Sequence, residues 1–273
     1  MSVHSTQKRI SIPDLRAMKG KAKIVMLTAY TKPMAQLIDA HCDVLLVGDS
    51  LGMVVYGLDS TLGVSLDTMI AHTQAVVRGS SHSCVLLDMP FGSYQESKQQ
   101  AYRNCAKALA ESGAQGLKLE GGAELVETVE FLVARGIPIM PHIGLMPQRV
   151  NEMGGFKAQG REEDAAKKWT TIAKDFEAAG AFGVLIEGTV EPVARAVAEA
   201  ISVPLIGIGA SPACDGQVLV TEDILGMFPD FTPKFAKRYV EMGVEVSKAA
   251  EAYAAEVRGG VFPGLAHCFG VKK

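Results

Sequence analysis

Short apolar runs alternate with longer helical patterns along the whole chain, and this alternation limits the possible folds more than any other feature of the sequence. Each run has the length of a strand, is rich in Val, Leu and Ile, and mostly lacks the every-second-residue pattern of a half-exposed strand. Such runs are typical of parallel strands that are covered on both faces. The eight predicted strands are residues 24–28, 44–47, 84–88, 116–120, 137–142, 183–187, 203–209 and 217–220.

The helical patterns between the strands end at glycine, a residue that can adopt the left-handed conformation that closes a helix. Examples are the patterns that end at Gly113, Gly136 and Gly180. Two helix-to-strand junctions nearly repeat, because residues 112–120 read SGAQGLKLE and residues 179–187 read AGAFGVLIE. The chain is therefore predicted to use one βα module repeatedly.

Repeated βα modules form a parallel sheet, which is either closed as a (β/α)8 barrel or open as a doubly wound sheet. The open form commonly binds dinucleotides through a G-x-G-x-x-G sequence after the first strand, and this chain has none there. Barrels of this type typically need about 250 residues, and the chain has 273. We therefore predict an α/β fold, a TIM-type (β/α)8 barrel that forms a single domain over residues 1–273 with a C-terminal helix and tail.

Three segments fall outside the regular repeat. Insertions at residues 51–65 and 143–162 are long for a compact domain, and such loops are more often functional than idle. The second insertion is rich in glycine and is interpreted as a lid. The last helix is predicted over residues 233–258, before a tail whose apolar residues are expected to pack on the barrel or on a neighbouring subunit.

The charge and cysteine content exclude several classes of protein. The 27 basic and 30 acidic residues are mixed along the sequence, so the chain offers no basic face for a nucleic-acid backbone. No segment reaches the roughly 18 unbroken apolar residues of a membrane span, and the N-terminus lacks the apolar core of a signal peptide. The five cysteines are scattered without a C-x-x-C spacing and are interpreted as reduced thiols. These features predict a soluble, cytoplasmic protein that binds neither nucleic acid nor membrane.

Polar side chains stand at five successive strand ends, which is where a barrel places its chemistry. One such residue can simply cap the following helix, and capping is an alternative for Asp49 taken alone. Five strand ends in succession are harder to explain by capping. The residues are Asp49 with Ser50, then Asp88, Glu120, His142 and Glu187.

Four of these residues are carboxylates, which would repel one another and raise one another's pKa unless a cation lay among them. Without a neighbouring cysteine or paired histidines, they suit a hard cation such as Mg²⁺ rather than Zn²⁺. The alternative is that Lys and Arg side chains from the loops neutralise them. Lys118 lies two residues before Glu120, so both side chains face the same way on a strand. Lys118 either forms a structural ion pair with Glu120 or binds an anionic substrate, such as a carboxylate or an enolate.

His142 allows two interpretations. A lone histidine at a strand end is often a hydrogen-bonded core residue, and the other histidines have no metal-binding spacing. Its place at the mouth of the barrel also makes it a candidate for substrate binding. Arg149, Asn151 and Lys157 in the long loop could reach a ligand, although polar loop residues are usually solvated.

Several stretches of the chain match, in combination, those of a known family. They are VMLTAYTKPMAQLID, LLVGDSLGMVVYGLDSTL, LLDMPFGSY, GLKLEGG, PHIGLMPQ with GGFKAQGR, IGIGA, DGQ, KFAKRY and the FPG of the tail. On these residues the chain resembles the ketopantoate hydroxymethyltransferase (3-methyl-2-oxobutanoate hydroxymethyltransferase) family over nearly its whole length. The combination of VGDSLGM, GLDSTL and KLEGG is specific, whereas none of them would suffice alone.

The resemblance implies a (β/α)8 barrel that adds the one-carbon unit of 5,10-methylenetetrahydrofolate, as a hydroxymethyl group, to 3-methyl-2-oxobutanoate. The product is 2-dehydropantoate, on the route to pantothenate and coenzyme A. The ketone and carboxylate oxygens of a 2-oxoacid can chelate Mg²⁺, so the implied reaction passes through an enolate that the metal stabilises. Members of the family are homo-oligomers, commonly decamers.

The resemblance also implies roles for residues at matching positions. Asp49, Asp88 and Glu120 are the implied Mg²⁺ ligands. Glu187 is the implied proton acceptor, and partial burial would raise the pKa of its carboxyl group toward the range that a general base needs.

Another set of residues is expected to bind the oxoacid. The expected substrate contacts are Asp49, Ser50, Asp88 and Lys118, with His142 added from its position at the strand end. The chain departs from the family pattern in small ways, at Thr189, Val190, Ser211 and Ala266. Ser211 is expected to alter folate-side contacts or loop geometry, and Ala266 the contacts of the tail.

Two other functions compete with this one. Isocitrate-lyase-like barrels, which include carbon–carbon lyases and phosphonomutases, also use strand-end carboxylates, Mg²⁺ and an enolate. They are expected to carry a K-x-C-G-type loop, and this chain has none. The other alternative is a barrel that only binds a metabolite or assembles a complex. The presence together of Asp49, Asp88, Lys118, Glu120 and Glu187 argues against a barrel that has lost its activity.

Overall fold

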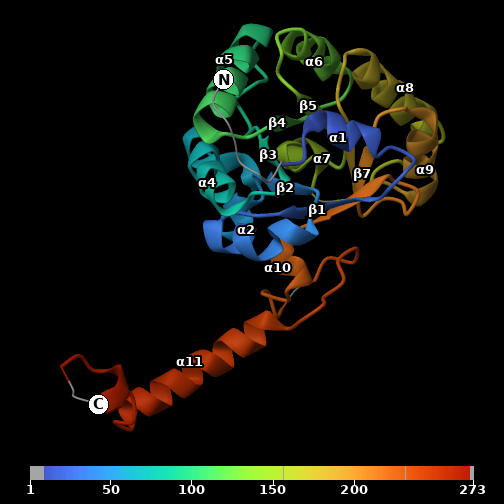
Figure 1. The fold of residues 1–273 in the computed structure, drawn as a ribbon. Helices are drawn as coiled ribbons and strands as arrows, with labels where there is room; N and C mark the ends of the chain where they lie inside the picture. Colours follow the sequence, from blue (N-terminus) through green and yellow to red (C-terminus); the bar gives the residue numbers. More distant parts are fainter. Residues whose placement is uncertain (1–8, 156, 231, 271–273) are drawn as a thin grey trace. The chain divides into compact units, whose positions relative to one another are not determined.

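Eight parallel strands close into a barrel in the computed structural model of the chain, which describes residues 9–155, 157–230 and 232–270. Each strand pairs with its neighbours in the sequence, and the last strand pairs with the first, so the sheet has no free edge. The predicted (β/α)8 fold is confirmed (Figure 1). The strands are β1 (Ile24–Thr28), β2 (Val44–Val47), β3 (Cys84–Asp88), β4 (Gly116–Glu120), β5 (Ile139–Gly144), β6 (Val184–Glu187), β7 (Leu205–Ile208) and β8 (Gly216–Leu219).

Helices lie before the first strand, where Leu15 packs with the apolar residues inside the barrel, and between most of the later strands, where they cover the outside of the barrel (Figure 1). They are α1 (Ile12–Ala17), α2 (Lys32–Ile38), α3 (Leu51–Val54), α4 (Leu66–Gly79), α5 (Lys98–Ser112), α6 (Val126–Val133), α7 (Val150–Met153), α8 (Ala165–Ala178) and α9 (Glu191–Ala200). The predicted glycine stop is confirmed at Gly113, which follows α5 with φ of 78°. Four 3-10 turns accompany these helices: η1 (Asp39–His41), η2 (Thr61–Gly63), η3 (Ala123–Leu125) and η4 (Pro147–Arg149).

Most of the strands bury side chains on both faces, as the unbroken apolar runs predicted, whereas Val25 of β1 is 46% exposed and Gln217 of β8 is also exposed. Leu117 and Leu119 of β4 belong to the cluster of apolar residues between the strands and the helices. Met26, Leu86 and Met140 belong to a second cluster, inside the barrel. Because side chains alternate along a strand, the residues between the outward ones face the interior.

Two strands begin two residues later than predicted, and a proline precedes each of them; β6 begins one residue later than predicted, at Val184. β5 begins at Ile139, after Pro138, and β7 begins at Leu205, after Pro204. Proline has no N–H group for the strand ladder, so regular pairing starts at the next residue. β5 also continues to Gly144, two residues beyond the predicted end at His142.

The chain divides into two compact units, one up to Val220 and one from Thr221. The second unit contains α10 (Thr221–Ile224), α11 (Met242–Arg258) and η5 (Leu265–His267). That the whole chain is one domain stays a prediction.

The helix predicted over residues 233–258 is wrong in its first part, because α11 begins only at Met242. The preceding residues hydrogen-bond with the turn that follows α10. The N–H of Tyr239 donates to the carbonyl of Ile224 at 2.8 Å, and that of Met242 donates to the carbonyl of Leu225 at 2.8 Å. These contacts with a distant turn replace the local hydrogen bonds of a helix.

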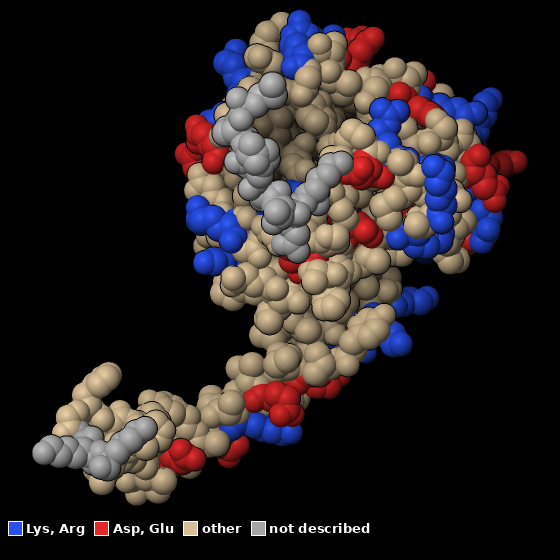
Figure 2. Space-filling model, in the orientation of Figure 1, with Lys and Arg blue, Asp and Glu red and all other residues tan. Residues whose placement is uncertain are grey.

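The surface and the thiols of the described residues agree with the composition. Basic and acidic side chains are interspersed over the face of the barrel unit seen in Figure 2. None of the helices in the described part of the chain combines the length and the apolar character that a membrane span needs. All five cysteines are free thiols, and four of them are buried.

Candidate active site

The alternation of side chains brings most of the predicted site residues to the interior of the barrel at one end. Asp88, Glu120 and Glu187 are the last residues of β3, β4 and β6. Asp49 follows the end of β2 by two residues, and His142 pairs with Glu120 in the register of β4 with β5. The carboxyl ends of parallel strands therefore gather the acidic groups that the sequence scatters over 139 positions of the chain, from 49 to 187.

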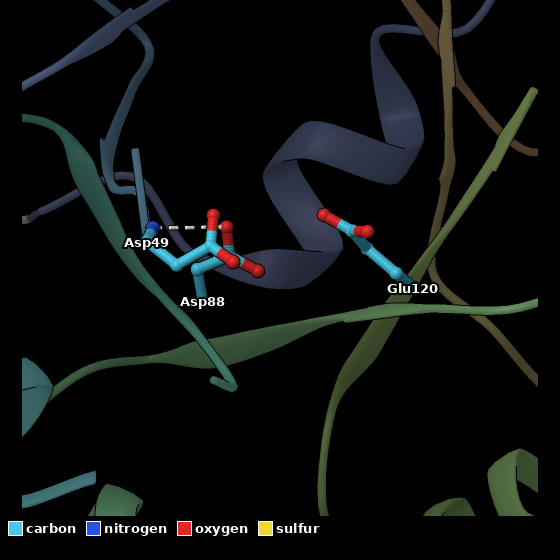
Figure 3. A group of neighbouring side chains, drawn as sticks. All are labelled: Asp49, Asp88 and Glu120. Carbon is cyan, nitrogen blue, oxygen red and sulfur yellow. Dashed lines mark hydrogen bonds between the residues drawn. The ribbon is translucent and has the colours of Figure 1, made fainter. Parts of the chain in front are cut away.

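Asp49, Asp88 and Glu120 form a compact carboxylate cluster. One oxygen atom from each lies within 4.8 Å of the others, and the three residues are 3%, 1% and 5% exposed. Figure 3 shows their carboxyl groups turned toward a common space, with Glu120 reaching it from the side opposite to Asp49 and Asp88. The backbone N–H of Asp49 donates to Oδ2 of Asp88 at 3.2 Å. The alternative that Asp49 caps a helix is wrong, because Ser50 occupies the N-cap position of α3 and makes no side-chain capping bond.

The surroundings shift the pKa of these three carboxyl groups in different directions. Burial and the charge of Glu120 raise the pKa of Asp49. Burial raises the pKa of Asp88 well above its ordinary value, even though Lys118 opposes this. Burial would also raise the pKa of Glu120, but the charge of Lys118, together with the hydrogen bond from the backbone N–H of Gln148, outweighs burial and lowers the pKa to about 2. Lys118 alone therefore does not offset the burial and mutual repulsion of the three carboxyl groups.

Lys118 lies on the floor of the cluster. Its Nζ is 2.8 Å from Oδ2 of Asp88 and 3.4 Å from Oε1 of Glu120. Burial would lower the pKa of Lys118, but the charges of Asp88 and Glu120 outweigh it, so the pKa is raised and the ammonium group stays charged. Lys118 forms the ion pair with Glu120 that was one of the two expectations, and its contact with Asp88 is the shorter of the two. An ammonium group has three N–H donors, so Lys118 can also donate to an anionic ligand at the mouth.

His142 connects the carboxylate cluster with Glu187. Its Nδ1 is 3.1 Å from Nζ of Lys118, so the ammonium group donates to it and the ring proton of the neutral imidazole is placed on Nε2. Nε2 is buried, has no hydrogen-bond partner among the described residues, and lies 3.4 Å from Oε2 of Glu187. Burial and the charge of Lys118 lower the pKa of His142, which keeps the ring neutral. The ring is thus more than a core histidine, because it contacts both Lys118 and the carboxyl group of Glu187, and its Nε2 makes no hydrogen bond among the described residues.

Glu187 differs from the three clustered carboxylates. Its side chain is 18% exposed, whereas that of Glu120 is 2% exposed. Burial and the negative charge of Glu120 raise the pKa of Glu187 to about 8. A carboxyl group with a pKa near neutrality can take up and release a proton under ordinary conditions, as a general base must.

Ser50 lies at the edge of the site and is half-buried. Its Oγ is 2.9 Å from the hydroxyl group of Tyr30, which follows β1 by two residues. This contact joins the ends of neighbouring strands and fixes the serine hydroxyl beside Asp49.

Two residues of the site were missed by sequence reasoning. Gln148, in η4, donates from Nε2 to Oδ2 of Asp49 at 2.9 Å, and its backbone N–H donates to Oε2 of Glu120 at 3.0 Å. The hydroxyl group of Tyr94 lies 2.7 Å from Oε1 of Gln148 and accepts the backbone N–H of Glu120 at 3.0 Å. Both lie in loops after strands, and both occur in the matching stretches LLDMPFGSY and PHIGLMPQ. Both residues lie several positions after a strand end, so the strand pattern does not indicate a role for them. Only the folded loops place them beside the carboxylate cluster.

The remaining predicted loop residues lie around the site rather than in the cluster. Arg149 pairs with Glu124 and is 3.8 Å from Glu152, so its charge is already shared. The hydroxyl of Thr189 donates to the backbone carbonyl of Glu187 at 2.9 Å, and Ser211 donates to Oε1 of Glu191 at 2.8 Å. Thr189 and Ser211, two of the three departures from the family pattern in the barrel, thus each donate a side-chain hydrogen bond.

The donor set fits a hard divalent cation. Oδ1 of Asp88 is buried and has no hydrogen-bond partner in the described part of the chain, although a buried carboxylate oxygen is normally paired. Carboxylate oxygens without thiolate or paired imidazole ligands suit Mg²⁺. A cation among the three carboxylates would satisfy this oxygen and relieve the repulsion that raises the pKa of Asp49.

The chain is similar to members of one family over its full length. The sequence profile described as ketopantoate hydroxymethyltransferase matches residues 9–265. "3-Methyl-2-oxobutanoate hydroxymethyltransferase 1" of Hahella chejuensis is 60% identical over 273 residues, which cover 100% of this chain and 98% of that protein. The protein named 3-methyl-2-oxobutanoate hydroxymethyltransferase in Brucella canis is 60% identical over 272 residues, covering 100% of this chain and 99% of that protein.

Solved structures with the same fold come from other enzymes. A putative phosphonomutase from Burkholderia cenocepacia has a TM-score of 0.61 at 16% identity, over 91% of this chain and 99% of that one. A 2,3-dimethylmalate lyase, described as a member of the PEP mutase/isocitrate lyase superfamily, has a TM-score of 0.59 at 18% identity, over 94% and 90% of the two chains. A phosphonopyruvate hydrolase solved in complex with oxalate and Mg²⁺ has a TM-score of 0.59 at 13% identity, over 93% and 89%. At these identities the similarity establishes the barrel fold.

Proposed function

The chain belongs to the ketopantoate hydroxymethyltransferase family, and from this premise we propose that it transfers a hydroxymethyl group to 3-methyl-2-oxobutanoate, with 5,10-methylenetetrahydrofolate as the one-carbon donor. The product would be 2-dehydropantoate, an intermediate on the route to pantothenate and coenzyme A. In the balanced reaction the oxoacid loses the proton on C3, a new carbon–carbon bond forms there, both carbon–nitrogen bonds of the donor break, and water supplies the hydroxyl oxygen.

The observation that carries this proposal is the division of the four inward carboxylates into two groups. Asp49, Asp88 and Glu120 lie together with an unpaired oxygen on Asp88, whereas Glu187 lies outside this cluster. The cluster is suited to hold Mg²⁺. When bound there, the ion would supply a positive charge that polarises the oxygen atoms of the oxoacid and makes its C3 proton more acidic.

Lys118 and Ser50 are suited to bind the oxoacid. The ammonium group of Lys118 stays charged and lies at the centre of the site, so it can oppose the charge of the substrate carboxylate. The hydroxyl of Ser50, held by Tyr30, can donate a hydrogen bond at the mouth. Asp88 contacts Lys118, and Asp49 immediately precedes Ser50. The carboxyl groups of both aspartates face the same space (Figure 3).

Glu187 would remove the C3 proton, and His142 would position it. The pKa of about 8 makes Glu187 a strong base for a carboxylate. Nε2 of His142 lies 3.4 Å from Oε2 of Glu187 with no hydrogen bond between them among the described residues, so a small rotation of either side chain would let the ring donate to the carboxylate and hold it in one orientation. The neutral ring is also suited to contact the substrate as the reaction proceeds.

An assay with 3-methyl-2-oxobutanoate, in the presence and the absence of 5,10-methylenetetrahydrofolate, tests this function. We expect 2-dehydropantoate only when both substrates and Mg²⁺ are present. Deuterium exchange at C3 of the oxoacid should need no folate. Cleavage of 2-oxoacids or phosphonates without folate would instead support a lyase or phosphonomutase, the enzymes with which the fold is shared.

We also propose that the protein is cytoplasmic and acts as a homo-oligomer, with the decamer as the expected assembly. Five free cysteines suit a reducing compartment. α11 has no buried residue and exposes Val244, Val246, Tyr253 and Val257, which other copies of the chain could cover. Light scattering coupled to size-exclusion chromatography measures the assembly, and a monomer at micromolar concentration would refute it.

A further inference from the structure

A cavity of about 530 Å³ opens directly beside the carboxylate cluster. Glu120, Tyr94 and Gln148 form the wall that it shares with the cluster. Pockets for small molecules typically enclose about 300–1,000 Å³. A five-carbon oxoacid would fill only part of this space, so the cavity has room for a second, larger ligand.

The exposed aromatic ring in this cavity is Phe91. Phe91 lines the cavity and is 49% exposed. Exposure of a large apolar side chain to water is unfavourable, so a ligand that covers this ring would gain free energy of binding. Leu62, on η2, contributes a second apolar side chain to the lining. Together they form the apolar part of a lining whose other members are Tyr94 and polar or charged side chains.

The turn that carries Phe91 is rigid. Gly92 has φ of 81°, a conformation that favours glycine, and its N–H donates to Oε1 of Gln95 at 2.8 Å. The hydroxyl of Ser93 donates to the carbonyl of Pro90 at 2.6 Å, and the side chain of Asn104 donates to the carbonyl of Ser93 at 2.6 Å. The turn is thus tied to α5, and it holds the ring of Phe91 in position before any ligand arrives.

The rim of the cavity offers more hydrogen-bond acceptors than positive charge. Asn151 and Glu152 line it, and Arg149, also in the lining, shares its charge with Glu124 and Glu152. A carboxylate and an amide oxygen beside an exposed aromatic ring suit a flat heterocycle that carries N–H and NH₂ groups. A second small anion is a poor match for the same surface.

We propose that this cavity is the binding site for the ring system of the one-carbon donor, a reduced pterin, which stacks on Phe91 and points its one-carbon unit toward Glu120. The inference rests on the proposed function and adds the position of the second substrate. Glu120 borders both the cavity and the cluster that would hold the oxoacid. A pterin in the cavity would therefore lie next to the oxoacid. The acceptors on Asn151 and Glu152 would bind the N–H edge of the ring at the outer end.

The test compares Phe91→Ala with Phe91→Trp, and uses Tyr102→Ala on α5 as the matched control for loss of an exposed aromatic ring. For Phe91→Ala we expect the KM for 5,10-methylenetetrahydrofolate to rise about tenfold, as loss of a stacked ring does elsewhere. Deuterium exchange at C3 of the oxoacid, in which no folate takes part, should stay within about twofold of wild type. Phe91→Trp should retain most of the affinity. Calorimetric titration with tetrahydrofolate gives a second readout that does not depend on turnover.

Three outcomes would overturn the inference. The first is an unchanged affinity of Phe91→Ala for tetrahydrofolate, and the second is an equal loss of exchange and transfer, which would mean that the ring only supports the barrel. The third is a wild-type protein that exchanges no deuterium with the oxoacid, because this refutes the proposed function as well. In the first two outcomes the wild-type activity remains, so the failure concerns the location of the pterin site alone.

Discussion

The side-chain nitrogen of Gln148 lies 2.9 Å from Oδ2 of Asp49, across 99 positions of the sequence. The same nitrogen also donates to the backbone carbonyl of Met89 at 2.9 Å, and the backbone N–H of Gln148 donates to Oε2 of Glu120 at 3.0 Å. One residue of the loop after β5 therefore orients carboxyl groups from the ends of β2 and β4. Groups that hold metal ligands in position are part of a metal site, because they fix the direction of the ligand oxygens.

Gln148→Ala should weaken Mg²⁺ binding by about 10- to 100-fold, since this is the usual effect of removing a partner of a metal ligand. Calorimetry with Mg²⁺, or electron paramagnetic resonance with Mn²⁺, measures the affinity without an activity assay. Gln74→Ala removes a glutamine whose side chain donates to Glu111 on the barrel surface, and it should leave the affinity unchanged. Equal affinities in the two variants would refute the positioning role of Gln148.

Lys118→Met should destabilise the metal-free protein by about 3 kcal/mol, because it leaves buried carboxylates without their cation. The expected loss follows from the 2.8 Å and 3.4 Å contacts of Lys118 with Asp88 and Glu120. Mg²⁺ should restore part of the stability, since it supplies positive charge to the same oxygens. Urea denaturation with EDTA and with excess Mg²⁺ measures both effects. Equal stabilisation of wild type and variant by Mg²⁺ would contradict the shared role of the two cations.

The fold was predictable because its signal repeats. Eight apolar runs separated by helical patterns favour a closed barrel even where single boundaries are wrong, as at Pro138 and Pro204. The start of α11 was not predictable in this way, because residues 233–241 carry a helical pattern and yet the N–H of Tyr239 donates to Ile224, at the end of α10. A local pattern cannot reveal a competing partner elsewhere in the chain.

The acidic part of the site was also predictable, because strand ends meet at one end of a barrel. The sequence placed Asp88, Glu120 and Glu187 at such ends, and the alternation along β4 placed Lys118 beside Glu120. Gln148 and Tyr94 could not be identified in the same way. They reach the cluster through irregular loops, whose course follows from tertiary packing rather than from a periodic pattern.

Glu187→Gln should reduce deuterium exchange at C3 of the oxoacid by at least about 100-fold, the usual contribution of a general base. The wild-type rate should rise with pH, because only the ionised carboxyl group accepts a proton. Burial holds the pKa of Glu187 at about 8 in the absence of metal, and Mg²⁺ should lower the apparent pKa because positive charge favours the carboxylate. Glu191→Gln, on the exposed start of α9, is the control and should exchange normally. A flat pH profile for wild type would exclude Glu187 as the base.

Asp39→Asn should destabilise the barrel by about 2 kcal/mol near neutral pH, through the loss of hydrogen bonds to a charged acceptor. The carboxylate of Asp39 accepts Ser80 Oγ at 2.6 Å and the backbone N–H groups of Ser81, His82 and Ser83 at 2.7, 2.9 and 3.0 Å. Burial would raise its pKa, but these bonds outweigh burial and hold the pKa well below the ordinary value of 3.8.

The contribution of the Asp39 carboxylate to the free energy of unfolding should decrease as the pH falls. A lowered pKa in the folded state means that the stability is present above about pH 3.8 and is lost as the pH falls toward the folded value. The free energies of unfolding of wild type and Asp39→Asn, measured by urea denaturation, should therefore converge as the pH falls below 4. Asp59→Asn, which changes an exposed aspartate, should stay close to wild type throughout. A difference between wild type and Asp39→Asn that stays constant from neutral pH to pH 3 would mean that the side chain acts through its shape and not through its charge.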